Sequence, residues 1–519
     1  MSNVEKMGQI VKVFLTRRKI ARVLQGLVVF FITTVILSCG LGQVITRPAE
    51  PIVPTQNVEN PTALARTEVQ SPTVSDNDLP GIPTSGPLIQ AADLVYLGAF
   101  RLPDASIRPK TFEYGGNAMT FYPGGDLSGA SDGFPGSLYI TGHDRLPYGE
   151  LPDGDQVAEL SIPVPKITKN LDELNLAEFI QDFQDIAKGF FTGLDEIPRI
   201  GMAYLDTPAT GPKIHLAWGQ HLQPDPPAAS HAWFGLDLKA PDLQGVWFIG
   251  NQSLYSVNGY MFEIPAQWAE QYTSGRVLAT GRFRDGGWSG MGPALFAFTP
   301  WTDDQGTPAE TGSHLKETVL LLYENSTNTE NIERSMLDYQ HPDEWEGGAW
   351  LSTRSGKSGV LFAGTKSNGE KYWYGYVNPS GAQLPCVEGE MVGQFPLCRQ
   401  SDGSVCPEQD LVECTGHSDY RGWWSTHFDA EFILYNPDDL ARVARGEIDP
   451  WIPQPYATVD IDEYLLQNPG GVEPDMIGTG DQRRFRIGDV AFDRQNGLLY
   501  LLELFADRAK PVVHVWQIQ

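Results

Sequence analysis

The last stretch of the chain, residues 487–518, has the pattern of three short β-strands in succession. The apolar runs cover 488–493, 498–503 and 512–518. Asn496 and Gly497 separate the first two runs, and this dipeptide favours a tight hairpin because both residues can adopt positive φ angles. Three strands with an apolar face cannot bury themselves alone. The rest of the chain must therefore supply surfaces that cover them.

Similar strand pairs, each opening on glycine, recur upstream of this stretch. The openings lie at 115–121, 200–206, 290–298 and 347–352, and a second apolar run follows each of them. Glycine at these positions suits the crowded axis of a ring of sheets, where side chains have little room. The pattern predicts an all-β fold, a β-propeller over residues 92–519. We expect six blades, with five to seven possible.

The two ends of this domain complement each other. Residues 96–103 form a single strand without a hairpin partner, whereas the C-terminal unit has three strands and lacks a fourth. Their pairing would close the ring and leave no open sheet edge. Third strands are expected at 157–163, 260–265 and 431–437. The segment 230–265 can either finish one blade or form most of another, so the number of blades stays open.

Two insertions interrupt the predicted blades, at about 166–195 and 378–425. In the first, apolar residues from Leu176 to Ala187 follow helical spacing, between Asn175 as N-cap and Gly189 as the stop. We therefore expect an amphipathic helix there. The second is a cysteine-rich loop with Cys386, Cys398, Cys406 and Cys414. In an exported chain this even number favours two disulfides, with neighbours paired, over a zinc site, which usually needs closely spaced cysteine pairs.

The N-terminal residues 1–38 have the pattern of an export signal. A basic segment precedes the apolar run 26–38, which is short for a membrane span. The run ends in Ile36-Leu37-Ser38-Cys39, which resembles the lipobox of bacterial lipoproteins. The resemblance implies that Cys39 receives the lipid and tethers the protein to a membrane outside the cytoplasm. The alternative is an uncleaved anchor helix. Residues 39–91, rich in Pro and Thr, are expected to be a disordered tether.

Charged residues cluster at the predicted blade openings. Asp285, Glu346 and Asp489 each stand beside a glycine, and Glu113 lies two residues before Gly115. Arg199 and Arg486 occupy similar places in two other units. If the openings line the axis, these groups converge at one mouth of the tunnel. Such carboxylates can form a structural charge network, hold Ca²⁺, or act as the acid and base on a glycosidic bond, with Asp285 and Glu346 as the pair.

Histidine and tryptophan residues give weaker candidates. His143 stands beside Asp144 after the second strand of the first unit, but adjacent residues at a strand end point apart. Trp288 is a candidate for stacking on a sugar ring, although most Trp residues of a propeller fill space between blades. Further histidine candidates are His231, His417 and His427. Further candidates for stacking on a sugar ring are Trp233, Trp423 and Trp424.

The charge of the chain narrows the range of partners. The formal net charge is −28, and residues 1–38 hold six Lys or Arg and one Glu, so the rest of the chain carries about −33. A domain this acidic repels nucleic acid. No GxSxG, HExxH, Walker A or dinucleotide-binding pattern occurs in the required context. The chain resembles exported bacterial lipoproteins that carry a β-propeller, which include both binding proteins and enzymes.

Three functions are compatible with this pattern. We expect a binding protein for a glycan, a small ligand or a partner protein. The alternatives are a carboxylate- or metal-dependent polysaccharide hydrolase or lyase, and a structural protein of a surface assembly.

Overall fold

The structure, a computed structural model, describes most of the domain predicted from the sequence. The described residues are 86–104, 110–126, 131–142, 156–187, 199–219, 228–282, 284–285, 290–303, 305–325, 333–373, 391–392, 395–396, 423–472, 477–478 and 480–519. All of them belong to one compact unit, Gly81–Gln519. The leader, the lipobox with Cys39, the tether up to residue 85 and the four loop cysteines lie outside these residues.

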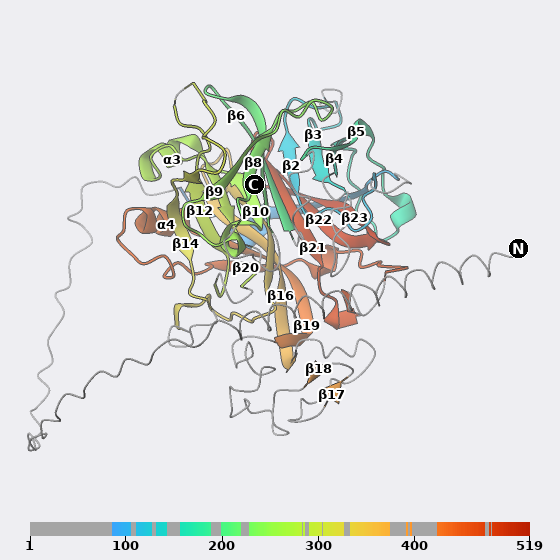
Figure 1. Ribbon diagram of the computed structural model, residues 1–519. Helices are drawn as coiled ribbons and strands as arrows, with labels where there is room; N and C mark the ends of the chain where they lie inside the picture. The colour runs from blue at the N-terminus through green and yellow to red at the C-terminus, as the bar shows by residue number, and fades with distance from the viewer. Residues whose placement is uncertain are drawn as a thin grey trace, which may run out of the picture. The chain divides into compact units, whose positions relative to one another are not determined.

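Five antiparallel sheets of the described chain form the blades of a propeller (Figure 1). Blade 1 contains β2 (Met119–Tyr122), β3 (Ser137–Thr141), β4 (Gln156–Ser161) and β5 (Phe179–Asp185). Blade 2 contains β6 (Arg199–Thr207), β7 (Gly211–Gly219), β8 (His231–Phe234) and β9 (Gln244–Ile249), with β13 (His314–Leu315) parallel to β9. Blade 3 contains β10 (Tyr260–Glu263), β11 (Leu278–Gly281), β12 (Ala294–Phe298) and β14 (Thr318–Leu322).

The remaining two blades complete the ring. Blade 4 contains β15 (Glu344–Ser352), β16 (Ser358–Trp373), β19 (Trp423–Tyr435) and β20 (Ala457–Asp460). Blade 5 contains β21 (Ile487–Asp493), β22 (Leu498–Asp507), β23 (Lys510–Ile518) and β1 (Leu94–Arg101). The inner strands β2, β6, β10, β15 and β21 each contact the next one around the axis.

Short elements connect the blades. They are α2 (Leu254–Val257), α3 (Ala266–Tyr272), α4 (Pro437–Ala444), the 3₁₀ turns η1 (Ala91–Asp93), η3 (Leu171–Glu173), η6 (Asp462–Tyr464) and η7 (Gly480–Gln482), and the strand pair β17 (Met391–Val392) and β18 (Phe395–Pro396). None of the described helices is long and apolar enough to span a bilayer.

The predicted closure of the ring is confirmed. β1 pairs with β23 in an antiparallel register that runs from Leu94 opposite Ile518 to Arg101 opposite Val512. The N-terminal strand therefore completes the sheet that the last three strands begin. This pairing satisfies the backbone groups along the outer side of β23, which would otherwise be an open sheet edge.

Five blades are present where we expected six, at the lower end of the predicted range. Residues 231–249 supply β8 and β9 and so finish blade 2. Residues 260–263, expected as a third strand, are instead the inner strand of blade 3. The glycine-led run 290–298 contains the third strand of that blade, β12, and not an opening. Apolar strands of similar length look alike in sequence, and only sheet pairing distinguishes an inner strand from a third strand.

The expected helix at 176–188 is a strand over its central part. Residues Phe179–Asp185 form β5, the outermost strand of blade 1, which pairs with β4. Apolar residues at 179, 180 and 183 fit helical spacing, but Phe179, Gln181 and Phe183 also alternate as a strand requires. Tertiary contacts favour the strand. The side-chain amide of Gln181 donates to Glu159 Oε2 of β4 at 2.6 Å and to the Leu236 carbonyl of blade 2 at 2.8 Å.

The turn between β21 and β22 is longer than the predicted two-residue hairpin. Asp493 pairs with Leu498, so four residues connect the strands. Gly497 has a φ of 69°, whereas Asn496 does not adopt a positive φ. The Asp493 carboxylate accepts from the backbone N–H groups of Gln495 and Asn496. This side-chain cap holds the turn at one end of the propeller axis.

The hydrophobic core is divided into slabs between adjacent blades. One cluster joins blades 5 and 1, where the rings of Phe121 and Tyr500 stack at 5.9 Å. Four further clusters fill the spaces between blades 1 and 2, 2 and 3, 3 and 4, and 4 and 5. Because every inner strand contributes to two slabs, the axis is held rigidly from all sides.

Candidate functional site

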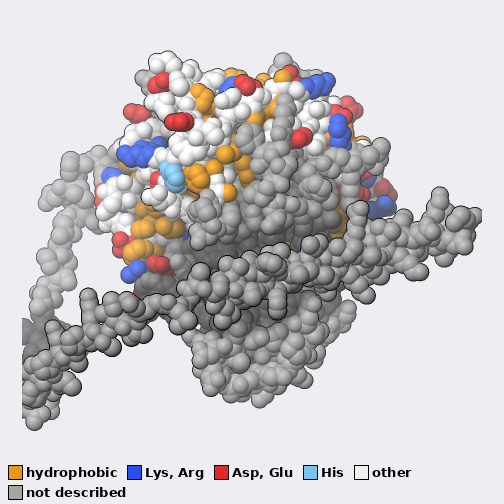
Figure 2. Space-filling view, viewed as in Figure 1, with side chains coloured by type: hydrophobic (Ala, Val, Ile, Leu, Met, Phe, Trp, Pro, Cys, Tyr) orange, Lys and Arg blue, Asp and Glu red, His pale blue; other side chains and the backbone are white. Residues whose placement is uncertain are grey.

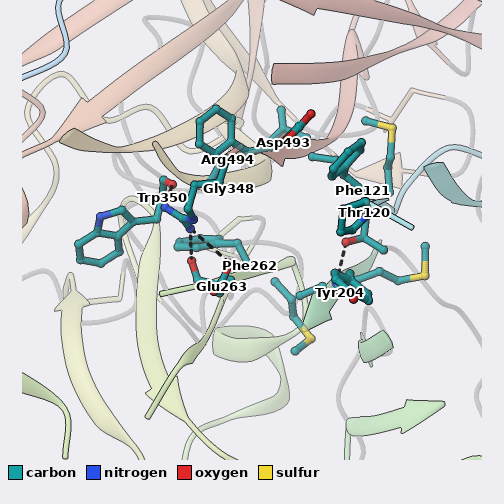
Figure 3. Close-up of a pocket in the computed structure, with 18 of the residues that line it drawn as sticks. Thr120, Phe121, Tyr204, Phe262, Glu263, Gly348, Trp350, Asp493 and Arg494 are labelled. Atoms are coloured by element: carbon teal, nitrogen blue, oxygen red, sulfur yellow. Dashed lines mark hydrogen bonds and ion pairs between the residues drawn. The ribbon is translucent and has the colours of Figure 1, made fainter. Parts of the chain in front are cut away.

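A pocket of about 220 Å³ lies on the propeller axis (Figure 3). Residues from all five inner strands line it, and Pro123 and Gln495 lie just beyond the ends of β2 and β21. The pocket therefore opens at the face where the inner strands end. Its lining is mostly apolar and consists of Met119, Thr120, Phe121, Pro123, Met202, Ala203, Tyr204, Met261, Phe262, Glu263, Gly348, Ala349, Trp350, Val490, Ala491, Phe492, Asp493, Arg494 and Gln495.

Small residues of the inner strands allow this axial arrangement. A Cβ atom on Gly201 would lie 2.6 Å from the Tyr260 backbone, and one on Gly347 would lie 2.6 Å from the Val490 nitrogen. Both distances are too short for a side chain, so glycine lets neighbouring inner strands approach closely. The sequence argument for glycine at the blade openings holds for these two positions.

Arg494 and Glu263 form a charge pair at the rim of the pocket (Figure 3). Arg494 donates from Nη1 to the Trp350 carbonyl at 3.2 Å and to Ser352 Oγ at 3.0 Å. Its Nη2 atom lies 3.5 Å from Glu263 Oε2, longer than the 2.7–2.9 Å of a strong charge-assisted hydrogen bond. The two side chains remain 32% and 42% exposed. Both charges are thus positioned by the protein yet accessible to a ligand.

Tyr204 stands on the β6 side of the pocket. Its backbone N–H donates to Thr120 Oγ1 at 2.7 Å, which ties β6 to β2. Burial, with smaller contributions from the negative charges of Asp206 and Glu263, raises the pKa of the Tyr204 hydroxyl to about 12. The hydroxyl is therefore neutral at physiological pH and can both donate and accept a hydrogen bond.

The opposite end of the axis holds two buried carboxyl groups, Glu346 and Asp489. Asp489 Oδ2 accepts from the Met119 N–H at 3.0 Å, and Oδ1 accepts from the Val490 N–H at 2.8 Å. Burial raises the pKa of Asp489 well above its usual value, and nearby Glu346 raises it further. The inner edge of an inner strand has no strand partner, so a carboxyl group here supplies acceptors for its N–H groups.

The other charged candidates do not join this pair. Glu113 is exposed and borders a polar surface depression together with Arg101 and Lys510. Asp285 is buried beside His341 and Tyr339, with 3.5 Å between Oδ2 and His341 Nδ1. Arg486 donates to Asp462 Oδ1 at 2.8 Å. Of the four carboxylates that we expected to converge, only Glu346 and Asp489 lie together on the axis.

A charged network lies at the base of the long β16–β19 hairpin. Its ladder continues to Trp373 opposite Trp423, well past Glu344, the first residue of β15. The buried Lys366 ammonium lies 3.1 Å from both carboxylate oxygens of Asp343. Burial raises the pKa of nearby Glu431 to about 7, despite the opposing effect of Lys366.

His427 projects from the same hairpin. Its Nε2 lies 2.6 Å from Asp429 Oδ1, and Asn368 donates to the second oxygen of that carboxylate at 2.6 Å. The contact with Asp429 holds the imidazole in one orientation. Trp423 and Trp424 are on β19, but their side chains are outside the described structure.

Two candidates are part of the core. Trp233 is 2% exposed and packs against Trp247 with 5.3 Å between ring centroids. It therefore presents no stacking surface. His231 is buried between Ser230 Oγ at 2.8 Å and Thr280 Oγ1 at 3.0 Å. Burial lowers the pKa of His231 to about 3, so the ring stays neutral.

Several sequence candidates cannot be placed. His143, His417, Trp288, Cys39, Cys386, Cys398, Cys406 and Cys414 lie outside the described residues, as does the side chain of Arg199. Within the described ranges, no group of three or more His, Cys, Asp or Glu side chains could hold a metal ion.

The sequence argument missed the rim residues Glu263, Arg494 and Tyr204. Glu263 ends β10 and Arg494 directly follows β21, whereas Tyr204 lies inside β6. The charged residues singled out from the sequence are those at the beginnings of the blades. The sequence does contain a signal for the charged residues. Where the apolar run of an inner strand ends in a charged residue, that residue lies at the mouth of the tunnel opposite the blade openings. Glu263 was also hidden by the assignment of its strand to the third position of a blade.

Comparisons with known proteins add little to this geometry. No family model and no curated protein matches the chain. The similar solved structures include chains of a Chaetomium thermophilum Polycomb Repressive Complex 2 bound to GSK126, with a TM-score of 0.27 and 8% identity over 82% of this chain and 98% of that one. A humanized mutant of the complex bound to GSK343 gives a TM-score of 0.27 and 10% identity, over 82% and 97% of the two chains. Likenesses this distant carry no argument about function.

Proposed function

We propose that the protein is a binding protein that takes a small amphipathic ligand in the axial pocket. The observation that carries this proposal is the pocket itself, which all five blades line and which has an apolar interior and a charged rim. Sites of this composition, with a few placed polar groups, are typical of small-molecule binding. The volume of about 220 Å³ is below the usual range for drug-sized ligands, so the ligand is a small molecule or the end of a larger one.

The interior favours an apolar group over a sugar ring. Thr120 offers a hydroxyl there, but its Oγ1 already accepts from the Tyr204 N–H. The Asp493 carboxylate caps its own turn and also accepts from Asn496 Nδ2 at 2.6 Å. A buried sugar would leave several hydroxyl groups without partners, and each would cost about 1–3 kcal/mol. An aliphatic or aromatic group has no such penalty.

The alternative of a polysaccharide hydrolase has less support. Asp285 and Glu346 are both buried, and neither is among the described residues that line the pocket. Figure 2 shows acidic and basic side chains interspersed over the described part of the visible face, without a large block of one sign. The proposal therefore rests on the pocket and not on a charged surface for a macromolecule.

Calorimetry with the full chain tests the proposal against a panel of small apolar, anionic, cationic and zwitterionic compounds. We expect saturable binding of at least one class, and loss of that binding in Gln495→Trp, which crowds the exposed rim without entering the core. Gln305→Trp is the matched control, because Gln305 is exposed and is not among the residues that line the pocket. Binding that survives Gln495→Trp, or no binding by any class, would contradict the proposal.

The lipobox resemblance suggests where such a protein works. We propose that Cys39 carries a lipid and that the propeller is held outside the cytoplasm at a membrane. The basic and apolar segments before Cys39 support this proposal. Expression in a bacterium with labelled palmitate should label the wild-type chain and not Cys39→Ser. Equal labelling of the two chains would refute the lipid attachment and leave the pocket proposal unaffected.

A further inference from the structure

From the rim of the axial pocket we infer the chemical class of the ligand: a zwitterion with an apolar side chain, such as a hydrophobic α-amino acid. This inference rests on the proposed function of the pocket. It follows from the positions of Arg494 and Glu263, whose side chains meet at the rim above an apolar interior (Figure 3).

The rim has one strong donor for an anion. Among the described lining residues, Arg494 is the only Lys or Arg. Two protein acceptors hold its Nη1, whereas Nη2 has only long contacts of 3.4 Å to the Glu263 carbonyl and 3.5 Å to Glu263 Oε2. At these distances the contacts are weak, so Nη2 can donate to a better placed acceptor. A ligand carboxylate is the acceptor that guanidinium binds best.

The rim also has one acceptor for a cation. Glu263 is 42% exposed on its side chain and is held only loosely by Arg494. The second carboxylate of the lining, Asp493, accepts three hydrogen bonds within its own turn. A ligand ammonium group is therefore expected to pair with Glu263.

The pairing of the two charges explains why both are needed on the ligand. An anion bound at Arg494 would meet Glu263, and a cation bound at Glu263 would meet Arg494. A zwitterion places its carboxylate at Arg494 and its ammonium group at Glu263, so each residue meets the complementary charge. The Arg494 guanidinium is fixed by Trp350 and Ser352, so its position does not depend on Glu263.

The interior of the pocket determines which kind of ligand side chain fits. Phe121, Phe262 and Met261 line the pocket, and its volume suits a compact apolar group. Burial of such a group contributes about 25 cal/mol per Å² of apolar surface removed from water. A polar or charged side chain would lose its hydration in the pocket and gain few partners there besides the Tyr204 hydroxyl.

Calorimetry with the full chain tests the inference with L-methionine, L-leucine and L-phenylalanine as probes. For the amino acid that binds best, we expect at least tenfold weaker binding of its amide, which lacks the carboxylate, and of its N-acetyl derivative, which lacks the ammonium group. Glu263→Gln and Arg494→Lys should each weaken binding of the free amino acid by about tenfold. Glu447→Gln, which alters the exposed Arg445–Glu447 pair far from the pocket, is the control and should bind as the parent does.

The outcomes separate the two proposals. Equal binding of the amide or the N-acetyl derivative, or of the amino acid to Glu263→Gln, would overturn the zwitterion and leave the pocket as a binding site. Binding of other apolar compounds with none of the three amino acids would do the same. No binding of any compound would overturn the proposed function together with this inference. Because Glu263→Gln keeps the shape of the side chain and Glu263 is on the surface of the rim, this variant is expected to fold.

Discussion

At the scale of single residues, burial decides the chemistry of a charged group more than its neighbours in sequence do. Glu346 and Asp489 are next to glycine at blade openings and Glu113 lies two residues before one, yet the first two are buried on the axis and Glu113 is exposed. His231 and His427 both lie within two residues of an aromatic residue in sequence. One is a neutral core residue, and the other is held by Asp429 at the surface. Sequence spacing does not distinguish these cases.

Glu431 allows a test of this effect. Because its pKa is raised to about 7 in the folded protein, the folded state holds this proton more tightly than the unfolded state. Its contribution to stability is therefore full at low pH and is lost as the pH rises from about 4.5 to 7. We expect Glu431→Gln to be more stable than the parent by about 1–2 kcal/mol at pH 8, after allowance for solvent screening, with little difference at pH 4.5.

Urea unfolding at pH 4.5 and pH 8 measures this difference. Glu310→Gln is the control, because Glu310 is exposed and should show no change at either pH. A difference between Glu431→Gln and the parent that is the same at both pH values would show that the carboxyl group does not titrate in this range.

At the scale of elements, backbone conformation makes β1 fit its neighbours. The register between β1 and β23 shifts between Tyr96 and Gly98, and Gly98 has a φ of 121°. A Cβ atom at this position would lie 2.4 Å from the carbonyl carbon of Lys166. The segment around Lys166 pairs with β1 through two backbone hydrogen bonds with Ala99, at 2.9 and 3.0 Å. The irregularity in β1 at Gly98 thus lets the segment around Lys166 lie close to β1.

Gly98→Ala tests this fit. The substitution meets both an unfavourable φ and a backbone contact, so we expect a loss of about 2–4 kcal/mol in the free energy of unfolding. Gly470→Ala is the matched control. Its Cβ would have no neighbour closer than 4.0 Å, and its φ is not in the positive range, so the change should be small. Equal effects of the two substitutions in urea unfolding would contradict this explanation.

At the scale of the whole molecule, ring closure is the feature that joins the two ends of the domain. β1 covers the outer side of β23, whose Val512, Val513 and Val515 are buried. Without β1, blade 5 would have three strands and an open apolar edge. The closure also fixes the blade that carries Arg494, so it supports the rim of the pocket.

Two truncations test the closure. We expect a chain that begins at residue 86 to fold, whereas a chain that begins at residue 102, which lacks β1, should aggregate or unfold at least about 10 °C lower. Thermal unfolding and size-exclusion chromatography of the two chains measure the difference. Equal melting temperatures would mean that the ring does not depend on the pairing of β1 with β23.

The sequence by itself determined the all-β class, the close approach at Gly201 and Gly347, and the pairing of the first and last strands. These features depend on local chemistry: strand alternation, the lack of a side chain in glycine, and the need to cover an open edge. The sequence did not determine where each blade begins and ends, because apolar runs of similar length can occupy any position in a sheet. The helical spacing of 176–187 also fits a strand, and the pairing of residues 179–185 with β4 distinguishes the two.

Only the tertiary structure decided the number of blades and the residues of the candidate site. Arg494 and Glu263 are separated by 231 residues and meet because their two blades are brought together around one axis. No local pattern encodes such a meeting, since it depends on the order and tilt of all the sheets between them. Burial is likewise a property of the assembled ring. For this reason the carboxylates singled out from the sequence became buried or dispersed, while the accessible charged pair lies at the opposite mouth.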